Sequence, residues 1–223
     1  MSYFKDSIGV AIIFGFLLAF FSESMWAQTP DQLIVDAVKQ MYNAALDPRA
    51  RIDPEEVTAE VILPLLATNQ ISRQVMGKHW RNMTDKQRVK FLNLFPKLIV
   101  KLHTKALDRI GEAIIYFPQN QLPKNGKVVV KMEIQFEGYT HKIDYYMKDF
   151  DGEWKVYDMN VNGLRMVPNY RSKLNRALNL VPRALLPIAC LRIPRSKECI
   201  QGKMEYILDG LDKKVNPRQH PDN

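Results

Sequence analysis

The chain has 223 residues, of which 46% are hydrophobic and 25% are charged, and its formal net charge is +8. This length suits one domain with a sizeable core, and the balance of residue types excludes a disordered chain and a polytopic membrane protein. The excess of basic residues favours anionic partners, namely nucleic acid, acidic proteins or the phosphates of a lipid surface. A solvated basic surface without a specific partner explains the charge equally well.

The N-terminal segment has the pattern of a secretory signal peptide. Lys5 precedes an unbroken apolar run over residues 8–21, which is shorter than the roughly 20 apolar residues that a transmembrane helix needs. We therefore predict a signal peptide over residues 1–27, cleaved after Ala27, with cleavage after Ser24 as the competing site. An uncleaved membrane anchor is the alternative, because the acidic Asp6 weakens the positive start of the segment.

Removal of this segment makes the exported chain more basic. Residues 1–27 contain one of the 32 basic and two of the 24 acidic residues, so 31 and 22 remain and the net charge becomes +9. Export to the periplasm argues against nucleic acid as the anionic partner.

Three stretches have the sequence signature of a helix N-terminus, in which a capping side chain precedes an acidic or amide residue. They are Thr29-Pro30-Asp31-Gln32, Asp53-Pro54-Glu55-Glu56 and Thr84-Asp85-Lys86-Gln87. Apolar residues at helical spacing follow each signature. Pro64 should end or kink the second helix, and Pro96 should kink the third, which has the longest helical pattern.

After Gly111 the pattern changes from helical spacing to alternation, which predicts antiparallel strands joined by short turns. Asn125-Gly126, Glu137-Gly138 and Asp151-Gly152 are the turn dipeptides. The predicted strands span 113–117, 127–136, 139–148 and 153–161. The last three form a meander, which becomes four-stranded if the first strand joins it.

Helical spacing returns after the strands. We predict helices over 169–180, 182–191 and 199–211, and a polar, disordered tail over 213–223. The result is an α+β domain over 28–212, in which several helices pack on one face of a curved, mostly antiparallel sheet of about four strands.

The chain has two cysteines, Cys190 and Cys199, both in the exported part. In an oxidising compartment we expect them to form a structural disulfide, and closure of so short a loop would stabilise the fold by about 2–3 kcal/mol. A C-x-x-C motif is absent from the sequence, so redox catalysis has little support.

No sequence pattern indicates a catalyst. The four histidines, at positions 79, 103, 141 and 220, lie on separate segments without metal-ligand spacing. Asp144 and Asp158 are expected on neighbouring strands, where an acid–base pair is one interpretation. Pairing with Lys142 and Lys155 on a solvated sheet face is the favoured one, and Asp158 is expected to hold the turn region together.

Three motifs occur in a fixed order along the chain. Residues 71–81 read I-S-R-Q-V-M-G-K-H-W-R, residues 84–99 contain a T-x-x-Q-R-x-x-F-x-x-x-F-x-x-L-I pattern, and residues 151–172 read D-G-E-W-K-V-Y-D-M-N-V-N-G-L-R-M-V-P-N-Y-R-S. In this order they resemble the MlaC (toluene-tolerance) family of periplasmic phospholipid-binding proteins. Two residues depart from the family's pattern. Pro96 lies inside the third predicted helix, and His103 stands where the family usually has a tyrosine.

The resemblance implies a fold that encloses a deep apolar cavity for the acyl chains of a phospholipid. It implies a non-enzymatic, monomeric periplasmic shuttle without a cofactor, whose cargo is the lipid. Such a carrier works between an inner-membrane ABC transporter complex and an outer-membrane lipoprotein complex, and so maintains the lipid asymmetry of the outer membrane. Nucleic acid is not an expected partner.

The resemblance also implies which residues hold the lipid. The expected helical wall consists of Val75, Met76, Trp80, Phe91, Phe95 and Leu98. The expected sheet wall and mouth consist of Tyr157, Met159, Val161, Leu164 and Met166, or of Trp154 and Val156 if the other face of the strand turns inward. Asn169 and Arg171 are expected to contact the phosphate or to cap a helix, with capping favoured.

Two other hypotheses stay open from the sequence. One is an enzyme or small-ligand binding module with a nuclear-transport-factor-like sheet-and-helix fold, in which an enzyme would use Asp144 or His141 as a base. The other is a membrane-anchored scaffold that retains its N-terminal segment.

Overall fold

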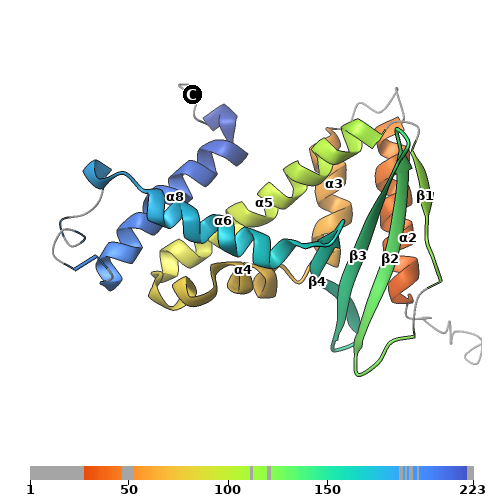
Figure 1. The fold of residues 1–223 in the computed structure, drawn as a ribbon, viewed down its shortest axis with the longest axis horizontal. Coiled ribbons are helices and arrows are strands. Elements are labelled where there is room, and N and C mark those ends of the chain that lie inside the picture. The colour runs from red at the N-terminus through yellow and green to blue at the C-terminus, as the bar shows by residue number, and fades with distance from the viewer. Residues whose placement is uncertain are drawn as a thin grey trace, which may run out of the picture.

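A five-stranded antiparallel sheet with helices packed against one face forms the framework of the protein (Figure 1). The computed structural model describes residues 28–46, 53–110, 113–119, 122–185, 188, 190, 193–194 and 196–219. The predicted signal peptide over 1–27 lies outside these residues. In the described part of the chain, no helix is long and apolar enough to cross a membrane.

The sheet is a simple meander with strand order β1-β2-β3-β4-β5. Its strands are β1 (Ile114–Tyr116), β2 (Lys127–Phe136), β3 (Tyr139–Phe150), β4 (Glu153–Val161) and β5 (Leu164–Arg165). The predicted α+β class is therefore confirmed, and the first predicted strand joins the sheet. The short fifth strand was not predicted.

Two-residue turns set the register of the hairpins. In Glu137-Gly138, Asp151-Gly152 and Asn162-Gly163 both residues have positive φ, and Asn125-Gly126 has the same geometry beside the start of β2. This is the turn type that matches the twist of paired strands. Burial alternates along β2, so that Val128, Val130, Met132 and Ile134 face the core.

A bulge interrupts the alternation in β4. Tyr146 pairs with Asp158 and Met147 pairs with Val156, which leaves Tyr157 as the extra residue. Because a bulge shifts the alternation by one residue, Val156 before it and Met159 after it can face the same side of the sheet.

The helices are α2 (Pro30–Leu46), α3 (Pro54–Ile62), α4 (Thr68–Met76), α5 (Asp85–Ile110), α6 (Met166–Leu180) and α8 (Lys197–Val215), with 3-10 turns η1 (Leu63–Leu65), η2 (Gly77–Asn82), η3 (Arg183–Leu185) and η4 (Pro217–Gln219). Three of them, α2, α3 and α5, begin where the capping patterns predict, and α6 and α8 begin two or three residues before the predicted starts. At α5 the capping box is reciprocal, because Thr84 N–H donates to Gln87 Oε1 and Gln87 N–H donates to Thr84 Oγ1, both over 3.2 Å. The helix α5 continues past Pro96.

The C-terminal region differs from the prediction at its end. In the predicted 182–191 helix, residues 183–185 form the turn η3 and the described residues 188 and 190 are α-helical, whereas the helix α8 continues to Val215, into the segment predicted as a disordered tail. Cys190 and Cys199 form the predicted disulfide, with their Cα atoms 4.7 Å apart.

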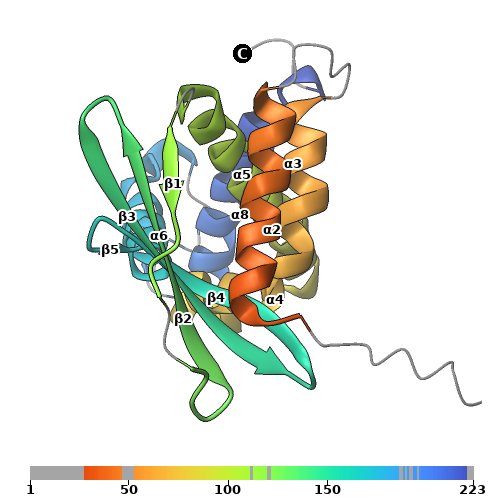
Figure 2. The ribbon, with the colours of Figure 1, turned by 90° about the vertical axis from the view of Figure 1, so that its right-hand side faces the viewer.

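The buried apolar residues form two clusters. We call the first the sheet-side cluster; it contains Ile34, Val38, Met41, Ile62, Ala113, Val128, Val130, Met132, Ile134, Met147 and Val156. We call the second the helix-side cluster; it contains Ile71, Val75, Met76, Met83, Phe91, Phe95, Ile99, Val167, Leu178, Met204 and Leu208. Figure 2 shows α2 beside α3 next to the sheet, with α8 farther from the viewer.

Candidate functional site

An apolar cavity of about 380 Å³ lies between the sheet and the helices α2, α5 and α6. Pockets that bind small molecules usually measure about 300–1,000 Å³, so this one has the size of a ligand site. The helices and the segment after α3 contribute Ile34, Ala37, Val38, Met41, Tyr42, Ile62, Leu65, Leu66, Ile71, Phe95, Ile99, Leu102, His103, Met166, Val167 and Tyr170. The sheet contributes Ile115, Met132, Ile134, Ile143, Tyr145, Val156, Asp158, Met159 and Val161.

The polar groups in the lining are mostly kept neutral by burial. Burial raises the pKa of the Tyr145 hydroxyl and of the Tyr170 hydroxyl above the usual tyrosine value. Burial lowers the pKa of the His103 imidazole, although its Nδ1 lies 2.8 Å from the Ile99 carbonyl oxygen and that hydrogen bond acts in the opposite direction. At neutral pH these three side chains therefore carry no charge.

Asp158 is the acidic residue of the lining, and its carboxylate is occupied by partners from the protein itself. Oδ2 accepts hydrogen bonds from Arg165 Nε at 2.8 Å and pairs with Arg165 Nη2 at 2.7 Å. Oδ1 accepts from the backbone N–H of Met159 at 2.8 Å and of Val167 at 3.0 Å. Asp158 thus caps the first turn of α6, as predicted for a residue that holds the turn region together.

This cap positions part of the cavity wall. Because Val167 N–H is bonded to the strand β4 through Asp158, the first turns of α6 lie beside the sheet and bring Met166, Val167 and Tyr170 into the lining. Arg165 lies on the other side of the carboxylate, with its guanidinium 3.9 Å from the ring centroid of Tyr146.

Four residues of the predicted ligand site line the cavity. Phe95 comes from α5, Met159 and Val161 from β4, and Met166 from α6. Val156, which was expected in the wall only if the other face of the strand turned inward, lines the cavity as well. The bulge at Tyr157 lets both the even-numbered Val156 and the odd-numbered Met159 and Val161 face inward.

The remaining residues of the predicted helical wall lie outside the lining. Val75, Met76 and Phe91 belong to the helix-side cluster, and Trp80 and Leu98 pack against it. Met76 has no exposed surface. The cause is geometric: this face of α4 and α5 packs against α6 and α8, which fill the space with Leu178, Met204 and Leu208.

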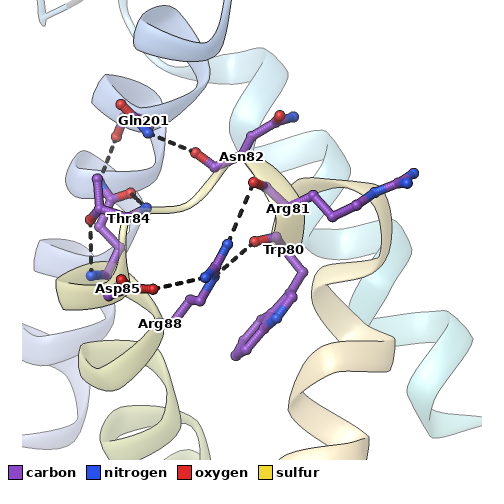
Figure 3. A network of polar contacts seen from close by, with 8 residues as sticks. Trp80, Arg81, Asn82, Thr84, Asp85, Arg88 and Gln201 are labelled. Carbon is purple, nitrogen blue, oxygen red and sulfur yellow. Dashed lines mark hydrogen bonds and ion pairs between the residues drawn. The ribbon is translucent and has the colours of Figure 1, made fainter.

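Trp80 is part of a network between η2 and the start of α5 (Figure 3). Arg88 Nε donates to the Trp80 carbonyl oxygen at 3.2 Å, and its Nη1 pairs with Asp85 at 2.8 Å. The guanidinium groups of Arg73 and Arg88 lie 5.6 and 5.8 Å from the indole centroid. These contacts within the protein account for the position of Trp80 without a ligand.

The predicted sheet residues Tyr157 and Leu164 also lie outside the lining. The ring of Tyr157 lies against that of Tyr146, with centroids 6.4 Å apart. Leu164 is 53% exposed in the short strand β5.

Arg171 makes a helix-capping contact, in line with the favoured alternative. Its Nε donates to the carbonyl oxygen of Gln74, in the last turn of α4, over 2.6 Å. The same side chain covers Gly77, where a Cβ atom would come within 3.3 Å of Arg171 Nε and where φ is +53°. Asn169 lies half-buried inside α6, because the helix begins at Met166.

Sequence reasoning missed the wall made by α2 and by the central strands. Ala37 and Val38 on α2 face Ile134 and Tyr145 across the cavity region, and all four had apolar or alternating patterns that predicted burial. A periodic pattern identifies a buried residue but contains no signal that distinguishes a cavity lining from a solid core.

Of the residues considered for catalysis, Asp158 lines the cavity with its carboxylate already bonded within the protein, whereas Asp144 and His141 do not line it. Asp144 accepts a hydrogen bond from Asn160 Nδ2 at 3.3 Å, and His141 Nδ1 lies 3.0 Å from Asn162 Nδ2. Among the described residues, no group of three or more histidine, cysteine or acidic side chains is placed to hold a metal ion.

Comparison with known proteins assigns the fold to a family. The sequence model of the MlaC protein family matches residues 34–180. The intermembrane phospholipid transport system binding protein MlaC of Haemophilus influenzae is 25% identical over 145 residues, which cover 63% of this chain and 66%, just under two thirds, of that protein. The toluene tolerance protein ttg2D of Pseudomonas putida is 23% identical over 174 residues, or 73% of this chain and 79% of that protein.

A solved structure supports the same fold. The phospholipid-binding protein of Ralstonia solanacearum, determined in complex with a phospholipid, superposes with a TM-score of 0.64 at 18% identity, covering 84% of this chain and 99% of that one. The family match extends over most of the chain, including every element that lines the cavity. The chain therefore belongs to the MlaC family.

Proposed function

We propose that this protein is a periplasmic carrier that holds the acyl part of a phospholipid in the cavity and moves it between membranes. The observation that carries the proposal is the cavity itself, about 380 Å³ of apolar space whose one acidic side chain is already bonded within the protein. The printed names of the Haemophilus and Ralstonia relatives, which refer to phospholipid transport and binding, support the same ligand class.

The physical need for a carrier follows from the hydrophobic effect. Each buried methylene group is worth about 0.8 kcal/mol, so a lipid with two long chains meets a barrier of order 20 kcal/mol when it leaves a bilayer unassisted. A cavity lined by Val38, Ile134 and Phe95 can replace the bilayer interior for acyl carbons. Leu102 lines the cavity and is 37% exposed, so the lining reaches the surface at α5, where a polar headgroup can stay in water.

The proposal includes the partners that the family implies. An inner-membrane ABC transporter complex and an outer-membrane lipoprotein complex would exchange lipid with the carrier, which would maintain outer-membrane asymmetry without performing a reaction. The N-terminal pattern of a signal peptide fits export to the compartment between these complexes. The net positive charge favours docking on acidic protein faces.

Native mass spectrometry tests the cargo directly. The protein would be purified from the periplasm without detergent, weighed intact, and then extracted with solvent to identify any released molecule. We expect a mass excess that corresponds to one phospholipid, and loss of that excess after extraction. A ligand-free mass that does not change after incubation with liposomes would contradict the proposal.

A further inference from the structure

The C-terminal end of α6 and the N-terminal end of α8 lie at the end of the molecule farthest from the sheet (Figure 1), and exposed apolar side chains occur between these two positions in the sequence. Leu180, Leu185, Ile188 and Ile193 are 78%, 55%, 74% and 63% exposed. They account for four of the twelve large apolar side chains that are exposed in the described part of the chain, although they fall within 14 consecutive positions. With the exposed Arg176 and Lys197 we call these residues the basic apolar tip.

The sequence that forms this tip is basic, and the first acidic residue after it is Glu198 in the first turn of α8. The sequence from Met159 to Lys197 contains eight basic residues and no acidic residue. Arg171, Lys173 and Arg176 are exposed along α6, on the approach to the tip. On α5, in contrast, Lys90 contacts the acidic residues Glu205 and Asp209 of α8.

The tip is fixed to the body of the protein by buried groups. Cys190 and Cys199 form a disulfide and are 5% and 0% exposed, so a buried covalent bond joins the tip to the first turn of α8. Ser196 Oγ accepts from Cys199 N–H at 3.1 Å and caps α8 directly after the tip. The exposed leucine and isoleucine side chains are therefore held on an anchored element.

We propose that the basic apolar tip binds the surface of an anionic lipid bilayer. Protruding aliphatic side chains flanked by arginine and lysine are the chemistry that inserts at the boundary between headgroups and acyl chains, with the bases on the lipid phosphates. An acidic protein face would match the positive charge of the tip, but it would offer no apolar surface to the four aliphatic side chains. The tip lies away from the cavity, so a protein held on a bilayer by the tip keeps α2 and the sheet free.

This inference goes beyond the proposed carrier function and does not depend on it. The family match ends at residue 180, so most of the tip lies outside the segment that the chain shares with the family. Membrane contact at this end would localise the protein whether or not the cavity holds lipid.

Vesicle sedimentation tests the proposal with the full exported protein. The probes are vesicles of phosphatidylcholine alone and vesicles of equal parts phosphatidylcholine and phosphatidylglycerol. We expect binding to the anionic vesicles that weakens with salt, and a loss of about tenfold in the double variant Leu180→Glu and Ile188→Glu. The matched control introduces the same charges at exposed apolar positions elsewhere, Leu122→Glu and Tyr139→Glu, and should stay within about twofold of the parent.

A second pair of variants separates the charge from the apolar contact. Arg176→Gln with Lys197→Gln should reduce binding to anionic vesicles, whereas Lys124→Gln with Lys127→Gln, also exposed, should do so less. Equal sedimentation of the tip variants and the parent would overturn the proposal. The proposal would also be overturned if the parent protein formed a dimer that does not bind vesicles, and if the double variant Leu180→Glu and Ile188→Glu were monomeric. Native mass spectrometry of the protein that stays in the supernatant measures the lipid in the cavity separately. Failure of this inference and failure of the carrier function are therefore distinguishable.

Discussion

The two hydrophobic clusters have similar residues but enclose different amounts of space. The helix-side cluster is filled by side chains from α4, α5, α6 and α8, and Met76, Met204 and Leu208 have no exposed surface. The sheet-side cluster contains the same kinds of residue, yet many of them border a cavity of about 380 Å³. The difference lies in what covers each surface, because α8 packs on α5 at one end and nothing in the described chain fills the space beneath α2 at the other.

This difference divides stability from ligand binding. A solid cluster contributes its full packing energy to the fold, whereas residues around an empty cavity lack partners on one side and gain them when a ligand enters. Four members of the helix-side cluster also line the cavity, namely Ile71, Phe95, Ile99 and Val167. We therefore expect substitutions of its other members, such as Phe91 and Val75, to change mainly stability and substitutions in the lining to change mainly lipid occupancy.

The largest expected effect is a cavity created in the solid cluster. Phe91→Ala removes a ring that is stacked on Phe95 at 5.0 Å between centroids. It should lower the free energy of unfolding by about 3–5 kcal/mol, measured by urea denaturation. Lipid occupancy of the folded fraction should not change, and a selective loss of lipid with little destabilisation would break the proposed division.

Replacement of one valine by phenylalanine in each cluster tests the difference between the two clusters directly. Val75→Phe adds a ring to the solid cluster and should cost about 1–3 kcal/mol of stability, because the core cannot accommodate it without strain. Val38→Phe adds the same ring at the cavity and should preserve stability while displacing lipid, measured by native mass spectrometry. Equal destabilisation by both variants would show that the space beside Val38 does not accept a ring.

A smaller effect is expected at the start of α5, which contributes Phe91, Phe95 and Ile99 to the helix-side cluster. Thr84→Ala removes one half of the capping box and should reduce stability by about 1 kcal/mol in thermal or urea unfolding. Ser172→Ala, at an exposed position on α6, is the matched control and should change stability much less. If both substitutions have the same effect, the capping box does not stabilise this helix.

The smallest effect concerns one titrating group in the cavity wall. The folded-state pKa of His103 is lowered below the ordinary value of 6.5, so its contribution to stability is complete above that pH and is lost as the pH falls towards the folded-state pKa. His103→Phe should therefore show a weaker loss of stability below pH 6.5 than the parent. Parallel pH curves for the two proteins would contradict a neutral, buried His103.

Local rules predicted much of the fold. The capping box at Thr84, the Asp151-Gly152 turn and the Cys190–Cys199 bond depend on neighbouring residues or on two cysteines alone, and all three are confirmed. The partition of the apolar residues could not be predicted in this way. Val75 and Val38 have the same side chain and comparable helical spacing, and only the helices that pack over them decide which one borders the cavity.

The bulge is a second feature that local patterns did not reveal. Strict alternation places Val156 opposite Met159 and Val161, and the sequence therefore offered two exclusive faces for the wall. The bulge at Tyr157 brings residues from both expected faces to the cavity, because Tyr157 has no paired residue on β3. The sequence around it contains no glycine or proline that would have indicated an irregular strand.

The bulge also makes the wall tolerant of one change in the length of β4. Deletion of Tyr157 would remove the unpaired residue and leave Val156 and Met159 two positions apart, so both would still face the cavity. Asp158 would stay between them, and with it the bond to Val167 N–H that holds α6. In this sheet, the gain or loss of one codon at the bulge therefore leaves the inner and outer surfaces of the wall unchanged, so a relative can have a regular strand here and keep the same lining.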